Sequence, residues 1–399
     1  MKQQARHILT VLCCCLYICS AAQKEISPAD TALSPAILAL ADAVIGGAQD
    51  STLILVGDIT VHGNKKTKPY IIERELPFKQ GEYIPKNELQ KKMLQAQQQV
   101  TNTSLFTSVV VYIESIHNNI AFINVDVKER WYVFPLPYFK LADRNFNQWW
   151  VEQKASINRV NYGLKFIMNN VSGRNDKLNI NLIAGYSRQI QLKYEQPFAD
   201  KSLKNGYSVG FSYSNQRELN YNTDFSKQSF YKQQNFAIET IRGELAYLYR
   251  PGIFTRHSFR VGYTSSKVSD TILLLNPNYF PGKGVLKKIS YPEFSYTIQY
   301  LKTDYNAYPS KGFIGDASII RKGWNKEMNL TQLQATANFI FPLTPKTGVQ
   351  LQAAGILKLP FDQPYINQQM FGYGGPYLRG LEYYVIDGVA GVMNRTTIR

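Results

Sequence analysis

Cysteine is almost absent from this 399-residue sequence, since its four cysteines all fall between residues 13 and 19. They lie in a segment with basic residues in its first seven positions, an apolar run over 8–22 and small residues before Gln23. This pattern predicts a secretory signal peptide, residues 1–22, cleaved after Ala22, with a lipoprotein anchored through Cys19 as the alternative. The mature chain then has no disulfide framework, no thiolate nucleophile and no cysteine-based zinc site.

Long apolar runs and histidines are also scarce. After the signal, no segment has about 18 uninterrupted apolar residues, which a transmembrane helix would need. The remaining histidines, His62, His117 and His257, do not have metal-ligand spacing to one another or to acidic residues. The sequence contains no nucleophile elbow and no phosphate-binding P-loop. We therefore predict no catalytic residue, no metal and no cofactor, and we rank a barrel enzyme as a third and weaker interpretation.

Aromatic residues, by contrast, are abundant, with 27 tyrosines and 21 phenylalanines, while the mean hydropathy is slightly polar at −0.26. This combination is typical of outer-membrane β-barrels, which have an apolar lipid face, a polar lumen and aromatic girdles. The net charge is +16, but the basic residues are scattered along the chain. Scattered cations favour a solvated lumen and contacts with anionic lipid head groups, and we predict no nucleic-acid partner.

Two regions follow an expected linker at 23–52. The apolar pattern over residues 53–132 predicts a small α/β domain with elements in the order β-α-α-β-β. Leu89, Met93 and Leu94 have helical spacing within it. Its expected elements are a strand at 53–62, helices at 69–76 and 87–99, and strands at 108–115 and 120–128.

From residue 133 to 399 the apolar period changes to two. Tyr207, Val209 and Phe211, for example, alternate with Ser208 and Gly210. A soluble β-sandwich would show the same alternation. Strands of about ten residues, long enough to cross a bilayer when tilted, and an aromatic-rich apolar face favour an all-β antiparallel transmembrane barrel instead. The pattern predicts twelve strands.

The small domain resembles a POTRA domain, the periplasmic module of the BamA/TamA outer-membrane insertase superfamily. The resemblance rests on Gly63-Asn64 after the first strand, on Arg74-Glu75-Leu76, on Gly81, and on Phe106 and Val109 between the second helix and the next strand. Gly63 and Asn64 favour positive φ, and Phe106 and Val109 are expected in the core.

Two further segments resemble barrel motifs of this superfamily. Asp304, Pro309 and Gly312 have the spacing of its hairpin turn. Gly-Gly-Pro-Tyr-Leu-Arg-Gly over 374–380 is similar to a long loop that folds into the lumen in relatives. The resemblance implies that Arg379, which follows Leu378, pairs there with acidic wall residues, and that Gly375 and Gly380 act as hinges. Leu381 departs from the usual aromatic residue.

The resemblance implies an outer-membrane protein whose N-terminal domain lies in the periplasm, with lipid, unfolded outer-membrane or exported client proteins and possible periplasmic assembly factors as its partners. It would insert, assemble or translocate clients by β-augmentation at the POTRA domain, with Ser108 to Ser115 as the expected edge strand, and through a barrel seam. The alternatives are a two-partner-type secretion pore and a simple transport or structural barrel. Relatives have sixteen strands and several POTRA domains, so we expect this sequence to be a fragment or a truncated gene, with a twelve-stranded product as the alternative.

Overall fold

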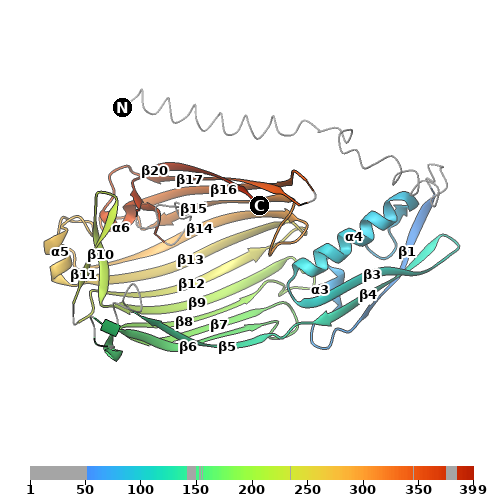
Figure 1. Cartoon of the computed structure of the whole chain (residues 1–399), viewed down its shortest axis with the longest axis horizontal. Coiled ribbons are helices and arrows are strands. Elements are labelled where there is room, and N and C mark those ends of the chain that lie inside the picture. Colours follow the sequence, from blue (N-terminus) through green and yellow to red (C-terminus); the bar gives the residue numbers. More distant parts are fainter. Residues whose placement is uncertain are drawn as a thin grey trace, which may run out of the picture. The chain divides into compact units, whose positions relative to one another are not determined.

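The structure, a computed structural model, describes residues 52–141, 150–151, 154, 156–233, 235–344, 346–373 and 384–399. The predicted signal peptide and all of the predicted linker except Thr52 lie outside these ranges. From Leu53 to Arg399 the chain forms one unit, which contains a small α/β domain and a large antiparallel sheet (Figure 1).

The small domain has the predicted elements and one more strand. Its sheet has the order β2-β1-β4-β3, in which β1 runs parallel to β4 and the other neighbours are antiparallel. The short β2 was not predicted, because three residues are too few for a period to show. The elements are β1 (Leu53–His62), α3 (Pro69–Glu73), β2 (Tyr83–Pro85), α4 (Lys86–Asn102), β3 (Phe106–His117) and β4 (Ile120–Glu129).

Helix α3 ends at Glu73, earlier than the predicted residue 76. Beyond it, the amides of Glu75 and Leu76 donate hydrogen bonds to the carbonyls of Ile72 and Glu73, three residues earlier, as in a turn. Pro77 disfavours helical backbone at the residue before it, which gives a physical reason for the early end.

The core of the small domain lies between its helices and its sheet. On α4, Leu89, Met93, Ala96 and Val100 are buried at intervals of three or four residues, so that one helix face covers the sheet. Leu94 was grouped with Leu89 and Met93 in the sequence, but it lies on the opposite, exposed face. Ala96 and Val100 continue the buried face in its place.

The large sheet contains twelve strands, which confirms the predicted number. Each strand pairs with its neighbours in the chain, always antiparallel, from β5 at one edge to β20 at the other (Figure 1). The strands are β5 (Val133–Leu141), β6 (Val160–Asn169), β7 (Lys177–Gly185), β8 (Ser187–Gln196), β9 (Asn205–Gln216), β12 (Ile238–Tyr249), β13 (Thr255–Val268), β14 (Lys288–Thr303), β15 (Gly312–Lys322), β16 (Leu330–Pro342), β17 (Gly348–Leu359) and β20 (Ala390–Ile398).

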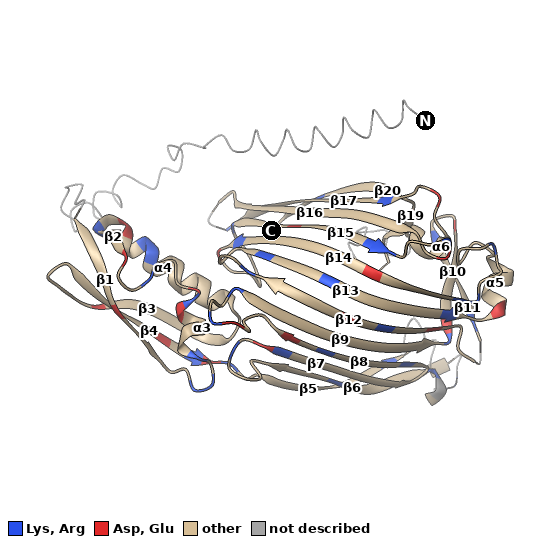
Figure 2. Cartoon of the chain, turned by 180° about the vertical axis from the view of Figure 1, so that it is seen from behind, with Lys and Arg blue, Asp and Glu red and all other residues tan. Residues whose placement is uncertain are grey.

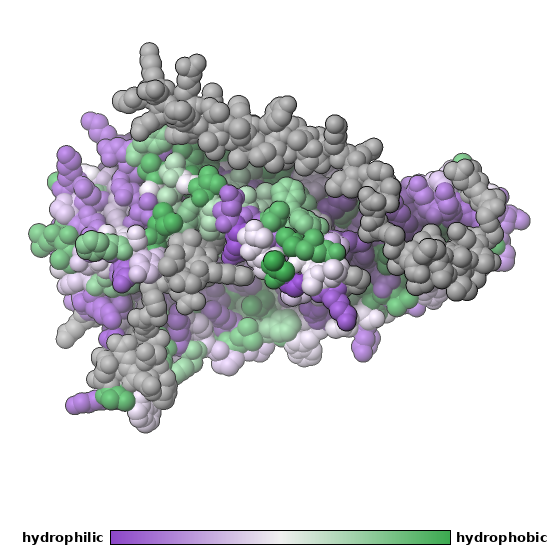
Figure 3. Space-filling view, turned by 45° about the horizontal axis from the view of Figure 1, so that its top comes forward, coloured by the Kyte–Doolittle hydropathy of each residue, from purple (hydrophilic) through white to green (hydrophobic). Residues whose placement is uncertain are grey.

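The two faces of this sheet differ in the way that the alternation predicts. Tyr207, Val209 and Phe211 are exposed on the outer face, while Ser208 and Gly210 face inward and are buried. Charged residues are spread along the strands rather than gathered in one cluster (Figure 2). Apolar and hydrophilic side chains both reach the surface of the strand-built part (Figure 3). Within the described ranges, no helix is long and apolar enough to span a membrane.

The loops at the two ends of the sheet are unequal. At one end, which we call the turn end, the strands are joined by connections of eight residues or fewer, such as 170–176 and 304–311. At the other, the loop end, longer connections build a second apolar core around Ile272, Phe280 and Met328. The elements of these connections are η3 (Ile157–Arg159), β10 (Glu218–Asp224), β11 (Lys227–Lys232), α5 (Asp270–Leu275), α6 (Tyr365–Gln368), β18 (Gln369–Phe371) and β19 (Ile386–Asp387).

Candidate functional site

The structure places the predicted small-domain residues at a turn and in the core. Gly63 has φ +84°, and an added Cβ would lie 2.0 Å from the carbonyl oxygen of Val127. Asn64 Nδ2 donates a hydrogen bond of 2.9 Å to the carbonyl of Thr67. Gly81 has φ +83°, whereas Phe106 and Val109 are buried in the core.

The predicted hairpin turn lies at the turn end, between β14 and β15. The Asp304 carboxylate accepts hydrogen bonds from the amides of Ser310 and Lys311, at 3.0 and 3.2 Å. Burial raises the pKa of Asp304, but hydrogen bonds from the Ser310 hydroxyl and from these backbone amides outweigh it and hold the pKa below its ordinary value. Gly312, with φ +126°, begins β15, and Pro309 lies inside the turn.

The predicted loop anchor, Arg379, and its neighbours Gly375, Leu378 and Gly380 lie outside the described residues. The stem of this loop is described, and it is held by a residue that the sequence analysis did not single out. Lys358 of β17 is buried and donates hydrogen bonds of 2.6 Å to the carbonyls of Asn367 and Gln369.

Acidic groups on the inner face are already engaged by arginines of the same wall. Arg242 lies 2.8 Å from Glu293 and 3.3 Å from Glu244, and Arg260 lies 3.8 Å from Glu244. These residues form an ion-pair network across β12, β13 and β14.

The site that sequence reasoning missed is the junction of the small domain with the turn end of the sheet. The carboxylate of Glu75 accepts two hydrogen bonds from the guanidinium of Arg250, at 2.6 and 2.7 Å. Arg74 donates a third, of 3.1 Å, to the same carboxylate. All three side chains are almost completely buried. The ion pair joins residues 175 positions apart, so no local pattern could reveal it, although Arg74 and Glu75 belong to the quoted family pattern.

Arg74 also bonds the backbone of the sheet's turns. Its Nε donates to the carbonyl of Leu203 at 2.6 Å, and its Nη2 donates to the carbonyl of Arg250 at 2.9 Å. Its guanidinium lies 4.5 Å from the ring centre of Phe198. Burial and the neighbouring charge of Arg250 lower the pKa of Arg74 to about 10, which still leaves it charged at neutral pH.

A second contact lies at the end of α4. Asn102 donates from Nδ2 to the carbonyls of Thr303 and Asp304 and accepts, at 2.8 Å, the amide of Asn306. The predicted hairpin turn is therefore one of the elements that receive the small domain.

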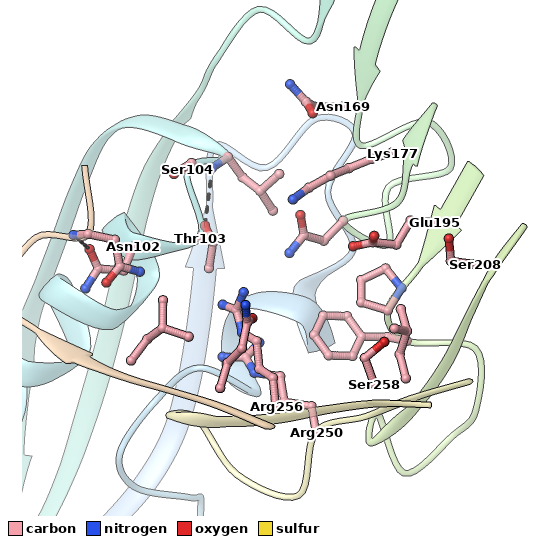
Figure 4. Close-up of a pocket in the computed structure, with 18 of the residues that line it drawn as sticks. Asn102, Thr103, Ser104, Asn169, Lys177, Glu195, Ser208, Arg250, Arg256 and Ser258 are labelled. Atoms are coloured by element: carbon pink, nitrogen blue, oxygen red, sulfur yellow. Dashed lines mark hydrogen bonds between the residues drawn. The ribbon is translucent and has the colours of Figure 1, made fainter. Parts of the chain in front are cut away.

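Beside this junction lies a cavity of about 580 Å³. Figure 4 shows Arg250, Arg256 and Lys177 with their charged ends in the same space, together with Glu195. Arg130 and Lys193 also line the cavity, whose other acidic residue is Glu75. Cations therefore outnumber carboxylates around this cavity, which favours polar or anionic groups over apolar ones.

Comparisons with known proteins agree with this architecture. The POTRA family, described as a surface antigen variable number repeat, matches residues 54–130, and the Omp85 superfamily domain matches residues 170–388. No curated protein sequence matches the chain.

Several solved structures are similar to it. BamA from Haemophilus ducreyi lacking POTRA domains 1-3 shares 16% identity with a TM-score of 0.45, over 86% of this chain and 67% of that one. CdiB from Escherichia coli shares 12% identity with a TM-score of 0.48, over 86% and 61% of the two chains. CdiB from Acinetobacter baumannii shares 12% identity with a TM-score of 0.47, over 87% and 60%. The chain thus spans about two thirds or less of the length of these structures.

The two family matches confirm the predicted resemblance and fold class. The Omp85 domain alone covers more than half of the chain. The chain therefore belongs to the Omp85 superfamily, and it is an outer-membrane β-barrel protein whose N-terminal POTRA domain lies in the periplasm.

Proposed function

We propose that this protein assembles or translocates client proteins at the outer membrane, with its POTRA domain as the receiving site. The observation that carries the proposal is a free sheet edge in a domain that is joined to the barrel mouth by a buried ion pair. Strand β3 is the last strand in the order β2-β1-β4-β3, as the sequence predicted. An exposed edge offers unpaired N–H and C=O groups to an extended chain.

The side chains of β3 suit such a client. Val110 and Tyr112 are exposed side by side on one face of this edge strand, and Ile116 is exposed beyond the register shift between Ile113 and Ser115. An unfolded barrel strand has apolar residues at every second position, so it can form backbone bonds to β3 and place its apolar side chains against this row.

The junction keeps this receiving edge coupled to the membrane part. Glu75 bonds Arg250 at the turn end, and the polar cavity opens beside that contact. No catalytic residue or cofactor is needed in this scheme, because hydrogen bonding of the client and its burial in lipid supply the free energy.

The alternatives are a secretion pore for one partner protein and a simple transport barrel with a periplasmic anchor. They differ from the proposed function in what is lost when the protein is removed. Depletion of an assembly factor lowers the amounts of many outer-membrane barrels, depletion of a secretion pore traps one exported protein in the periplasm, and depletion of a simple barrel changes neither.

The test is depletion in the native host, followed by complementation. Wild type and Leu94→Lys, which changes an exposed residue on the helix face, should restore barrel levels. Val110→Lys/Tyr112→Lys, which puts charge on the receiving edge, should restore them at most partially. Full rescue by the edge variant, or unchanged barrel levels on depletion, would contradict the proposal.

A further inference from the structure

The wall of the cavity beside the junction has an excess of positive charge. Its acidic residues are Glu75 and Glu195. Its six cationic residues are Arg130, Lys177, Lys193, Arg250, Arg256 and Arg260. A cleft lined mainly by one sign of charge raises the local concentration of ions of the opposite sign. The composition of the wall therefore favours an anionic ligand.

Both carboxylates of the wall already have cationic partners. Glu75 accepts two hydrogen bonds from Arg250, at 2.6 and 2.7 Å. Glu195 lies 3.9 Å from the ammonium group of Lys193. These pairs use the negative charge of the wall, so its remaining cations have no carboxylate of their own inside the cavity.

Three of these remaining cations are unpaired. Within the described ranges, the side chains of Arg130, Lys177 and Arg256 form no ion pair and no hydrogen bond, whereas Arg260 lies 3.8 Å from Glu244. The three residues are exposed, and Figure 4 shows the charged ends of Lys177 and Arg256 in the same space. Arg130 follows β4, Lys177 begins β7 and Arg256 is the second residue of β13. A ligand that binds all three therefore connects the POTRA domain with the sheet.

The excess charge also acts on the junction itself. Burial, followed by the charges of Arg250 and Arg256, lowers the pKa of Arg74, while Glu75 acts in the opposite direction. One carboxylate is thus opposed to three guanidinium groups at this contact. An anion beside Arg256 reduces the repulsion among these groups and stabilises the docked POTRA domain.

The size and position of the cavity define the ligand further. Its volume of about 580 Å³ is typical of small-molecule sites. Arg256 lies on the inner face of the sheet, because the outward residues of β13, such as Phe259 and Val261, have odd numbers. The outer face is the one that meets lipid, so the ligand is a soluble anion rather than a lipid head group. The planar fork of arginine matches the oxygen atoms of a phosphate group.

We propose that this cavity binds a soluble phosphate-bearing anion, which Arg130, Lys177 and Arg256 hold and which strengthens the junction of the POTRA domain with the barrel. The site makes the docking of the POTRA domain depend on a small molecule of the periplasm. This inference does not rest on client binding, because the ligand contacts neither β3 nor a client.

The test is titration of the full chain, in phosphatidylcholine nanodiscs and without divalent cations, with pyrophosphate. Calorimetry should detect binding. Arg256→Gln and Lys177→Gln should each weaken it about tenfold or more, because each removes a charge-assisted hydrogen bond. Arg256→Lys, which keeps the charge, should lose less affinity than Arg256→Gln. Lys267→Gln is the matched control and should leave the affinity unchanged, because Lys267 is on the same strand but does not line the cavity.

Hydrogen exchange tests the effect on the junction. At a pyrophosphate concentration about 100 times the wild-type dissociation constant, exchange at α3 and at the 197–204 turn should slow by about a hundredfold. In Arg256→Gln, the same concentration should slow it by about tenfold or less. Exchange without pyrophosphate shows whether each variant is folded and docked before the ligand is added.

Several outcomes would overturn the proposal. They are absence of binding, equal affinity in the wild type and in both glutamine variants, and unchanged exchange at the junction. Equal protection by sodium chloride of the same ionic strength would assign the effect to charge screening. Protection in phosphatidylglycerol nanodiscs without pyrophosphate would overturn the assignment to a soluble anion. Unchanged barrel levels on depletion contradict the proposed function alone, so the two failures are distinct.

Discussion

The POTRA domain and the barrel sheet of this protein expose apolar side chains for opposite reasons. Leu94 on α4 and Leu245 on β12 have the same exposed fraction, 56%. Leu94 lies on the outer face of a helix whose other face covers a core, and its neighbourhood is water. Leu245 belongs to a continuous outer row that includes Tyr247 and faces lipid. The exposed fraction alone therefore does not predict what a side chain contributes to stability, because that contribution depends on whether the side chain faces water or lipid.

The two regions also differ in the position of their apolar cores. The POTRA domain has a single core between helices and sheet, with Ile72, Ala96 and Ile123 among its most buried residues. The sheet places its polar residues inward and gathers a separate apolar core only at the loop end, around Ile272. The regions meet in a third kind of contact, a buried ion pair.

The largest effect is expected where the two regions meet. Glu75→Gln removes the only carboxylate bonded to the buried Arg74 and Arg250 among the described residues. Breaking a buried pair in this way costs about 3–5 kcal/mol, because it leaves uncompensated charge. We expect POTRA and barrel to separate, seen as faster hydrogen exchange at α3 and at the 197–204 turn in the full chain.

A second variant sharpens this test. Glu75→Gln/Arg250→Met removes one of the two stranded charges, that of Arg250, together with the carboxylate, and it should lose less stability than Glu75→Gln alone. If the double variant loses as much as the two single changes added together, the pair is not coupled and the junction has another basis.

The next largest effect is expected to distinguish a residue that faces lipid from one that faces water. Leu245→Arg should destabilise the barrel in a bilayer by about 2–4 kcal/mol, since Leu245 lies near the middle of its strand. Leu94→Arg should change the stability of the POTRA domain by about 0.5 kcal/mol or less. Urea unfolding in lipid vesicles measures both. Equal losses at the two leucines would mean that the outer face of β12 is not in contact with lipid.

The smallest effect compares two glycines within the POTRA domain. Gly63 and Gly81 have nearly equal positive φ angles, but only at Gly63 would a Cβ meet the backbone, at Val127. Gly81→Ala should cost about 1 kcal/mol from the backbone conformation alone, and Gly63→Ala up to about 3 kcal/mol. Thermal unfolding gives both values, and a larger loss at Gly81 would contradict the assigned turn geometry.

Much of this architecture follows from the sequence by itself. The period of two predicted the strands and their number, because side chains alternate between lipid and lumen whatever lies further away. Gly63 and two of the buried positions of α4, Leu89 and Met93, follow from local conformation and helical spacing. Leu94 shows the limit of that reasoning, since an apolar side chain on a helix can lie on either face.

Tertiary structure alone decided how distant segments of the chain are joined. Glu75 and Arg250 are 175 positions apart, and only the docking of two folded regions brings their charges together. Pro135 and Pro137 can be read in the sequence, yet only the register with β6 shows that both lie at positions that do not bond β6. Local conformational preferences determine which secondary structure a segment forms. Pairing and docking between distant segments determine which of its polar groups remain available for other interactions.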